Sequence, residues 1–291
     1  MKVVKPSFEE LRIDDLYKKV ELCGRVCYKS EDKITETSSL NFVKKICVNN
    51  HGSVLEHFAI TLKVSERVYN ELKSHNIPFF SFTNVTHPLV SFNLRAFVTC
   101  YNGKLFEESL KPITKFMADN YPDLFTFEGE TDEVVEVIND YSLLTKLERY
   151  THQRISMKLV TDRGVTHELV RHRLASFSQE STRYCNYGKD KFGNEITVIE
   201  PCDLNEETLK VWEKSMLEAE KSYFDMLNNG ATPQVARSVL PNSLKTEICI
   251  TATIEEWNLI FDLRCSFGAH PDCRAIMIPV RDYFLMKGYL D

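Results

Sequence analysis

The chain has 291 residues, which is enough for one large domain or two small ones with a sizeable core. Its net charge of −6 at pH 7 gives no general attraction to nucleic acid or anionic membranes. No apolar run has the length of a membrane span, and the first ten residues lack the core of a signal peptide. We therefore expect a cytoplasmic protein that binds neither membranes nor nucleic acid, in which any local basic cluster is informative.

The nine cysteines are scattered and odd in number. The close pairs, Cys23 with Cys27 and Cys265 with Cys273, do not have the spacing of a zinc site. The histidines show no HExxH spacing and have no CxxC companion. We therefore predict reduced, mostly buried thiols, no disulfide framework and no metal site.

Hydrophobic patterns predict a helix and a strand in the first part of the chain. The helix covers 38–50 and ends at His51-Gly52, and the strand covers 58–64, where apolar and polar residues alternate. Residues 65 to about 150 are less regular. They contain aromatic, strand-like pieces between Phe79 and Thr99 and a helical piece interrupted by Pro112.

Regular patterns return in the second half. Alternating residues at 155–159 predict a strand, and long helical spacing at about 205–228 predicts an amphipathic helix. Turn and cap signals predict the remaining pieces, which are a turn at 162–164, a helix over about 165–174, a loop over 185–194, Gly230 as a C′ residue, a short helix from Thr232-Pro233 to Pro241, a helix capped by Thr253 and Glu256, and a last helix opening at 269–271. Strands mixed with segregated helices indicate an α+β fold rather than a doubly wound sheet.

The densest basic cluster is Arg-His-Arg at 171–173, followed after seven residues by Ser-Thr-Arg-Tyr at 181–184. Three consecutive residues at a helix end project about 100° apart, so they serve two neighbouring ligands or one large one. On an extended segment, Ser181 and Arg183 project from the same side. A hydroxyl beside a guanidinium suits a phosphate, because Arg binds oxyanions in a bidentate manner. The charge pattern alone also fits a solvated basic surface loop.

Three further residues are candidates for chemistry. Arg237 is the one charge in a largely apolar turn, and it binds either an internal carboxylate or a ligand anion. Arg264 lies near the end of a helix, where Asp262 points elsewhere and is not an obvious partner. Cys185 adjoins the basic cluster and is either a nucleophile or, as we favour, a structural cysteine.

Four motifs together resemble those of the flavin-dependent thymidylate synthases. RHRLASFSQESTRY at 171–184 resembles the Arg-His-Arg signature of that family. HGSVLEH at 51–57 and PQVARSVLP at 233–241 resemble two other elements, and 251–274 resembles the C-terminal one. The resemblance covers roughly 20–64 and 150–290, and residues 65 to about 150 look like an insertion within a single catalytic domain, 1–291.

The resemblance implies the α+β fold of this family, a mixed sheet with helices, and a defined reaction. The enzyme would make dTMP from dUMP, with methylenetetrahydrofolate as carbon donor and FAD, reduced by NADPH, as hydride carrier. Tetrahydrofolate is released. The family is homotetrameric, with active sites at subunit interfaces, and needs no cysteine nucleophile.

The resemblance also implies residue roles. Arg264 falls on the position that activates the uracil ring, which agrees with the ability of a guanidinium to stabilise negative charge on N3 and its flanking carbonyls. The positions that match dUMP-binding residues are Glu168, Arg171, Gln179, Ser181, Thr182, Arg183, Arg237 and Arg264. The positions that match FAD-binding residues are His51, Ser53, Arg171, His172, Arg173, Gln179 and Thr253.

The chain departs from the family pattern at two flavin-contacting positions, where Thr253 and Glu255 stand in place of Asn and Arg. These departures motivate a different hypothesis, a nucleotide-binding module without turnover. A third hypothesis, RNA binding by the basic cluster and nearby aromatic residues, is opposed by the negative net charge.

Overall fold

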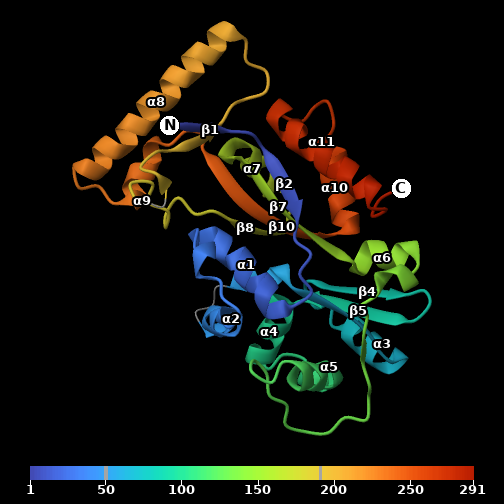
Figure 1. The fold of residues 1–291 in the computed structure, drawn as a ribbon. Helices are drawn as coiled ribbons and strands as arrows, with labels where there is room; N and C mark the ends of the chain where they lie inside the picture. The colour runs from blue at the N-terminus through green and yellow to red at the C-terminus, as the bar shows by residue number, and fades with distance from the viewer. Residues whose placement is uncertain (49–51, 190–191) are drawn as a thin grey trace.

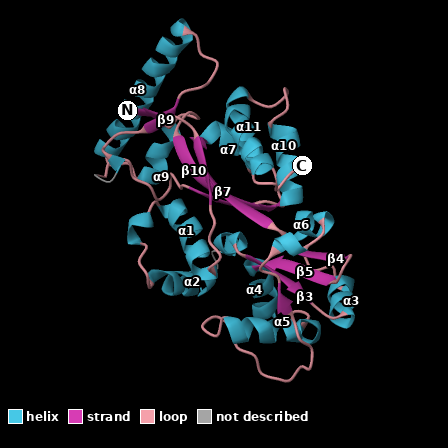
Figure 2. Cartoon of the chain, turned by 45° about the vertical axis from the view of Figure 1, so that its right-hand side comes forward, coloured by secondary structure: helices cyan, strands magenta, loops and turns pink. Residues whose placement is uncertain are grey.

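The computed structural model describes residues 1–48, 52–189 and 192–291, and shows two four-stranded sheets with helices around them (Figures 1 and 2). The strands are β1 (Lys2–Val4), β2 (Ser7–Glu10), β3 (Ala59–Lys63), β4 (Phe80–Asn84), β5 (Pro88–Asn93), β6 (Glu136–Val137), β7 (Arg154–Asp162), β8 (Ser176–Gln179), β9 (Thr197–Ile199) and β10 (Lys245–Thr253). The α-helices are α1 (Leu16–Tyr28), α2 (Ser38–Val48), α3 (Glu66–Ser74), α4 (Leu94–Gly103), α5 (Glu107–Asn120), α6 (Lys146–His152), α7 (Arg163–Leu169), α8 (Glu206–Asn228), α9 (Pro233–Ala236), α10 (Ile254–Arg264) and α11 (Pro271–Met286). The 3₁₀ helices are η1 (Glu31–Lys33), η2 (Gly52–His57), η3 (Tyr141–Leu143) and η5 (Arg237–Val239).

The first sheet, called the central sheet below, has the order β2-β7-β10-β8 and is antiparallel throughout. Its two central strands, β7 and β10, pair along their whole length. Ile248 and Ile250 of β10 belong to the core beneath α10 and α11, whereas Cys249 packs with Cys23 and Val26 of α1. Because neighbouring side chains of a strand point to opposite faces, α10 and α11 cover one face and α1 the other.

The second sheet has the order β4-β5-β3-β6 and is also antiparallel. Most of it comes from the stretch 65–150, and its aromatic residues stack, with the rings of Phe80 and Phe92 centred 4.9 Å apart. The same core includes Val20 of α1 and Val43 of α2. The stretch 65–150 therefore shares a core with the N-terminal helices rather than enclosing one of its own.

The α+β class is confirmed. We expected one sheet that contains both parallel and antiparallel strands. Instead, the only parallel pair among the described residues is β1 with β9, and both four-stranded sheets are antiparallel. The helix predicted over 38–50 is α2, the strand predicted over 58–64 is β3, and the helix predicted over 205–228 is α8, followed by Gly230 at φ +89°. None of the helices in the described ranges combines the length and apolar character that crossing a bilayer requires.

Three local predictions were wrong. Asp162 does not open a turn: it ends β7 and caps α7 by accepting a hydrogen bond from the Val165 N–H at 2.8 Å. The helix therefore begins at Arg163 and ends at Leu169, before the basic cluster. Pro112 does not interrupt α5, because burial of its ring beside Ile113 in the core offsets the lost hydrogen bond.

Candidate active site

The basic cluster lies in the turn that follows α7, not on a helix end as predicted. His172 is buried, with 5 % of its surface exposed, whereas Arg171 and Arg173 are exposed. The Arg171 Nε donates to the carbonyl of His167 at 3.1 Å. The turn thus points one side chain into the protein and leaves two guanidinium groups at its surface.

The buried His172 contacts Arg264, which also bonds a carboxylate from α7. The Arg264 Nε, at the end of α10, donates to the His172 Nε2 at 3.0 Å. The Arg264 Nη1 donates to Glu168 Oε2, on the last turn of α7, at 2.7 Å. Arg264 thus forms one cluster with His172, 92 positions earlier in the sequence, and Glu168, 96 positions earlier.

The electrostatic environment keeps His172 neutral. Burial, followed by the charge of Arg264, lowers the pKa of His172 below its usual value. Because His172 Nε2 accepts a hydrogen bond, the ring proton must sit on Nδ1. That nitrogen faces Glu256 Oε1 at 3.7 Å, and burial, followed by the neighbouring Glu255, raises the pKa of the Glu256 carboxyl. A neutral imidazole thus fixes the orientation of the Arg264 guanidinium.

A second group of predicted site residues begins with Gln179, the last residue of β8, and continues in the segment after it. The Gln179 side-chain amide donates to the hydroxyls of Thr166 at 2.9 Å and Thr246 at 3.2 Å. Residues 182–184 form a turn rather than an extended segment, so the condition under which Ser181 and Arg183 would project from the same side of a strand is not met. The turn nevertheless brings the two together, because the Arg183 N–H donates to Ser181 Oγ at 3.3 Å.

Arg237, at the start of η5, reaches the same turn. Its Nη1 lies 3.5 Å from Thr182 Oγ1, a long contact. Arg237 is exposed, and no carboxylate of the described residues lies within 4 Å of it, so the internal-carboxylate alternative is not supported. Arg171, Arg173 and Arg183 also have no carboxylate partner within the described ranges. Four exposed arginines without counter-charges suit an anionic ligand.

Of the residues predicted to bind flavin, not all lie in the part of the chain that the structure describes. Ser53 is exposed on η2, which packs against β8, and His51 lies outside the described residues. The η2 helix is tied to the central sheet by His57, whose Nδ1 bonds Thr251 Oγ1 at 2.8 Å. Thr253 caps α10, accepting from the Glu256 N–H at 3.2 Å. The side chain of Thr253 is therefore already engaged.

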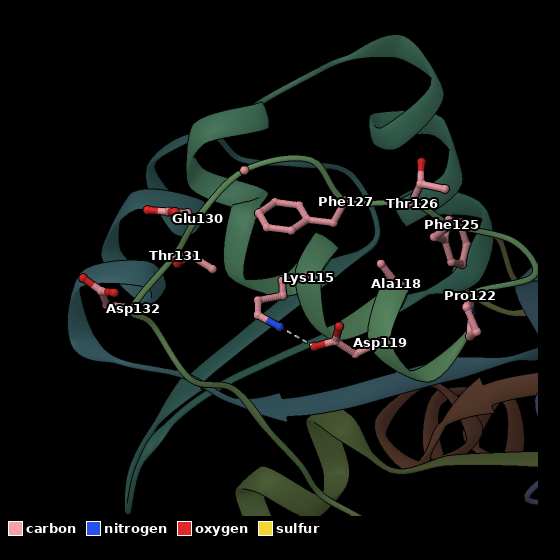
Figure 3. Close-up of a pocket in the computed structure, with 11 residues that line it drawn as sticks. Lys115, Ala118, Asp119, Pro122, Phe125, Thr126, Phe127, Glu130, Thr131 and Asp132 are labelled. Atoms are coloured by element: carbon pink, nitrogen blue, oxygen red, sulfur yellow. Dashed lines mark hydrogen bonds and ion pairs between the residues drawn. The ribbon is translucent and has the colours of Figure 1, made fainter.

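Of two cavities described here, one borders the site and the other does not. A cleft of about 410 Å³ borders Glu168, with His167, Asn242 and His270 in its wall, and is within the size range of small-molecule sites. A separate hollow of about 660 Å³ lies between α5 and the segment that follows it (Figure 3). Lys115 in its wall is bonded to Asp119 at 2.6 Å, and no predicted site residue borders it.

Cys185 is 1 % exposed and packs in an apolar cluster with Tyr187 and Tyr223, which supports the structural reading. Within residues 1–48, 52–189 and 192–291, no three His, Cys, Asp or Glu side chains converge as metal ligands would.

Sequence reasoning missed Glu256 as part of the cluster. Its position three residues after Thr253 indicated a capping role only, but the carboxylate is buried beside His172. Thr166 and Thr246, which hold Gln179, were also missed. Their signal was weak, because an isolated threonine on a strand or helix does not reveal its partner.

The fold and the cluster define an α+β protein in which exposed arginines surround a buried histidine. The family model described as "Thymidylate synthase complementing protein" matches residues 13–123 and 95–285, and the chain belongs to this family. The two matched ranges overlap over 95–123, inside the stretch that we expected to be an insertion.

Similar proteins include flavin-dependent thymidylate synthases from three organisms. The Pyrococcus furiosus protein is 32 % identical over 114 residues, which is 39 % of this chain and 47 % of that protein. The Geobacter sulfurreducens protein is 34 % identical over 116 residues, covering 40 % and 49 %. The Sulfurisphaera tokodaii protein is 34 % identical over 148 residues, covering 50 % and 56 %. The matches thus span about half the length of these relatives.

Among solved structures, a UMP/dUMP methylase PolB from Streptomyces cacaoi bound with 5-Br dUMP is similar to this chain at a TM-score of 0.43 and 13 % identity. The superposition covers 99 % of this chain and 93 % of that one. At this TM-score the likeness does not support a conclusion about the site.

Proposed function

We propose that this protein is an FAD-dependent thymidylate synthase that methylates dUMP reductively to dTMP. Methylenetetrahydrofolate is the carbon donor, NADPH is the reductant and tetrahydrofolate is released. The observation that carries the proposal is the cluster of Glu168, His172 and Arg264, assembled from three segments in a member of this family. The named relatives are flavin-dependent thymidylate synthases, which supports the same reaction.

The residues around the turn after α7 fit a flavin nucleotide. FAD carries a pyrophosphate, and Arg171 and Arg173 offer exposed guanidinium groups without carboxylate partners in the described part of the chain. Ser53 adds an exposed hydroxyl on η2. When bound, FAD supplies the redox chemistry, and the protein supplies binding and orientation.

The turn at 181–184 and Arg237 are assigned to the dUMP phosphate. Arg183 and Arg237 provide the positive charge, and Ser181 and Thr182 provide hydroxyls beside it. A dianionic phosphate held by two guanidinium groups and two hydroxyls satisfies charge and hydrogen bonding together. Glu168 and Gln179 then face the rest of the nucleotide from α7 and β8.

Arg264 is assigned to the uracil ring. Two of its nitrogens are held by His172 and Glu168, and Nη2 donates to no group of the described residues. A guanidinium so oriented stabilises negative charge on N3 and the flanking carbonyls, which makes C5 more nucleophilic. His172, neutral and buried, positions Arg264, and no cysteine nucleophile is needed.

We also assign the protein to the cytoplasm and to a homotetramer with active sites at subunit interfaces. The exposed apolar side chains near the cluster support this assembly, because such surface is costly in water. They lie on α10, beyond its end, and beside the basic turn, and are Leu259, Leu263, Phe267, Val170 and Leu174.

The visible absorption spectrum of the purified protein tests flavin binding. We expect flavin bands in the protein as purified or after reconstitution with FAD, and a change in those bands when dUMP is added. A protein that stays colourless after incubation with FAD contradicts the proposal.

The departures at Thr253 and Glu255 favour one other candidate, a nucleotide-binding module without turnover. Glu255 is an exposed carboxylate where an arginine is expected, so it adds negative charge beside the assigned flavin region. Stopped-flow mixing of the flavin-loaded protein with NADPH separates the two. Reduction in the presence of dUMP supports the enzyme, whereas dUMP binding without reduction supports the module.

A further inference from the structure

A cavity of about 620 Å³ lies at the edge of the central sheet formed by β2, opposite the edge formed by β8. Its walls come from the segment 10–14, from α1, from 139–142, from α6 and the residue after it, from the start of β7 and from the turn 287–289. None of the residues assigned above to dUMP or FAD lies in these walls. The inference below therefore does not depend on the proposed reaction.

Four cations in the cavity wall have no carboxylate within 4 Å in the described part of the chain. They are Lys19, Arg149, Arg154 and Lys287. The Arg149 Nη2 donates to the carbonyl of Gly288 at 3.0 Å, and the Arg154 Nη1 donates to Ser91 Oγ at 3.4 Å. Both acceptors are neutral, so neither guanidinium group is paired with a carboxylate.

Two of the acidic residues of the wall are already hydrogen-bonded, and the third is exposed; Glu10 and Asp14 act on Lys19 from beyond 4 Å. Glu10 accepts hydrogen bonds from Arg12, Tyr283 and Tyr289, each at 2.7 Å. Asp140 accepts from the backbone and hydroxyl of Ser142 at 2.9 and 2.6 Å. Asp14 is the remaining carboxylate and is exposed. Five cations, counting Arg12, therefore face three carboxylates.

Two of the cations lie where water stabilises them poorly. Burial lowers the pKa of Lys19 and that of Arg154 below their usual values. Gln153 Oε1, in the same wall, is buried and has no hydrogen-bond partner among the described residues. Unpaired buried charges are costly, and a bound anion removes that cost, whereas the Gln153 oxygen is an acceptor and needs a hydrogen-bond donor elsewhere on the same ligand.

We propose that this cavity binds a phosphorylated small molecule, with Lys19, Arg149 and Arg154 holding its phosphate. Two guanidinium groups and an ammonium match a dianionic phosphate in charge, and Arg presents paired donors to its oxygens. The volume has room for more than a phosphate alone, and Tyr141 and Gln153 offer a ring and an amide to the remainder.

Hydrogen–deuterium exchange of the full-length protein, with inorganic pyrophosphate as probe, tests this site at constant ionic strength. We expect pyrophosphate to slow exchange in peptides that cover 10–14, 139–142 and 287–289. Because exchange is measured peptide by peptide, binding of pyrophosphate to the arginines of the candidate active site slows exchange in other peptides and is distinguished in this way.

The variant Lys19→Met removes one charge and keeps an apolar stem, so it should raise the pyrophosphate concentration for half-protection at least about tenfold. Lys18→Met, an exposed neighbour outside the cavity, is the matched control and should behave as wild type. Arg149→Gln gives a second, independent loss of charge if Lys19→Met does not fold.

Absence of protection in the three segments at saturating pyrophosphate overturns the proposal. So does unchanged half-protection in both Lys19→Met and Arg149→Gln. Equal protection by citrate at the same concentration overturns the assignment to phosphate, because it shows that clustered carboxylates suffice.

Discussion

Arg264 lies in the candidate active site, and two of its three guanidinium nitrogens donate hydrogen bonds to other side chains. Glu168 neutralises its charge in part, and His172 fixes the plane of the group without adding charge. Glu256 lies behind His172 and faces its protonated nitrogen. A side chain held in this way does not need to reorganise when charge develops on a substrate, which is the condition for electrostatic preorganisation.

The variant Arg264→Ala should lower kcat by about 10²–10³-fold, because the lost interaction forms mainly with charge that develops during the reaction. The dissociation constant for dUMP should change much less. Steady-state kinetics and dUMP titration measure the two quantities. Arg281→Ala, at a half-buried arginine of α11, is the control for loss of charge. An unchanged kcat in Arg264→Ala removes this residue from the mechanism.

Cys185 provides a test at a residue that we assign to packing alone. Cys185→Ser should leave kcat unchanged, and should lower the melting temperature, because burying a hydroxyl in place of a thiol among apolar side chains costs free energy. Cys202→Ser, at an exposed position, should change neither. Loss of turnover in a folded Cys185→Ser protein revives a thiol nucleophile.

At the level of elements, α6 joins the two sheets through His152. Its Nε2 bonds Thr83 Oγ1 of β4 at 2.8 Å, and its Nδ1 bonds Ser91 Oγ of β5 at 2.7 Å. The next residues of the chain enter β7 of the central sheet. Protonating this ring replaces an acceptor by a donor and places a charge in a buried site.

The free energy of unfolding should therefore fall in acid. Burial, followed by the charge of Arg154, lowers the pKa of His152 from 6.5 to about 4. The unfolded chain takes up the proton below pH 6.5, and the folded chain does so only near pH 4, so stability present above 6.5 is lost across that window. The loss is roughly 3 kcal/mol at most. Urea unfolding at several pH values measures it.

His152→Gln should flatten this pH dependence, and His87→Gln, at an exposed position, should keep it. Equal pH dependence in wild type and His152→Gln shows that other groups are responsible. Glu148, whose pKa is lowered to about 2 by hydrogen bonds against the cost of burial, titrates in a lower window and does not explain a change above pH 4.5.

Some elements could be predicted from the sequence and others could not, for physical reasons. The long helix α8 was predictable because its apolar spacing and Gly230 are local signals. The end of α7 was not, because Val165 to Leu174 continues a helical pattern while the backbone turns at Leu169 to bury His172. The Glu168–Arg264 pair depends on contacts about a hundred residues apart, which spacing does not encode.

At the level of the whole molecule, the stretch 65–150 packs into the N-terminal helices through one shared core. It also follows η2, which carries Ser53 and Glu56, and Arg95 of α4 forms an ion pair with Glu56 at 2.5 Å. The predicted insertion is thus part of the frame that holds η2 against the central sheet. That it is an insertion within one catalytic domain stays a prediction.

The proposed homotetramer can be tested through the exposed apolar residues on α10 and just beyond its end. Phe267, after the end of α10, is 97 % exposed, and Leu259 and Leu263 are exposed one helical turn apart on α10 itself. We expect wild-type protein to have about four times the chain mass of 33.8 kDa by light scattering. Phe267→Asp should shift the protein to a smaller species because it places a charge in an apolar contact. A monomeric wild-type protein contradicts the assembly.

The most direct test of the proposed function is product analysis after incubation with dUMP, methylenetetrahydrofolate, NADPH and FAD. We predict that dTMP forms in amounts exceeding the enzyme, and that the folate product is tetrahydrofolate rather than dihydrofolate. Folded, flavin-loaded protein that binds dUMP but forms no dTMP under these conditions contradicts the proposed function.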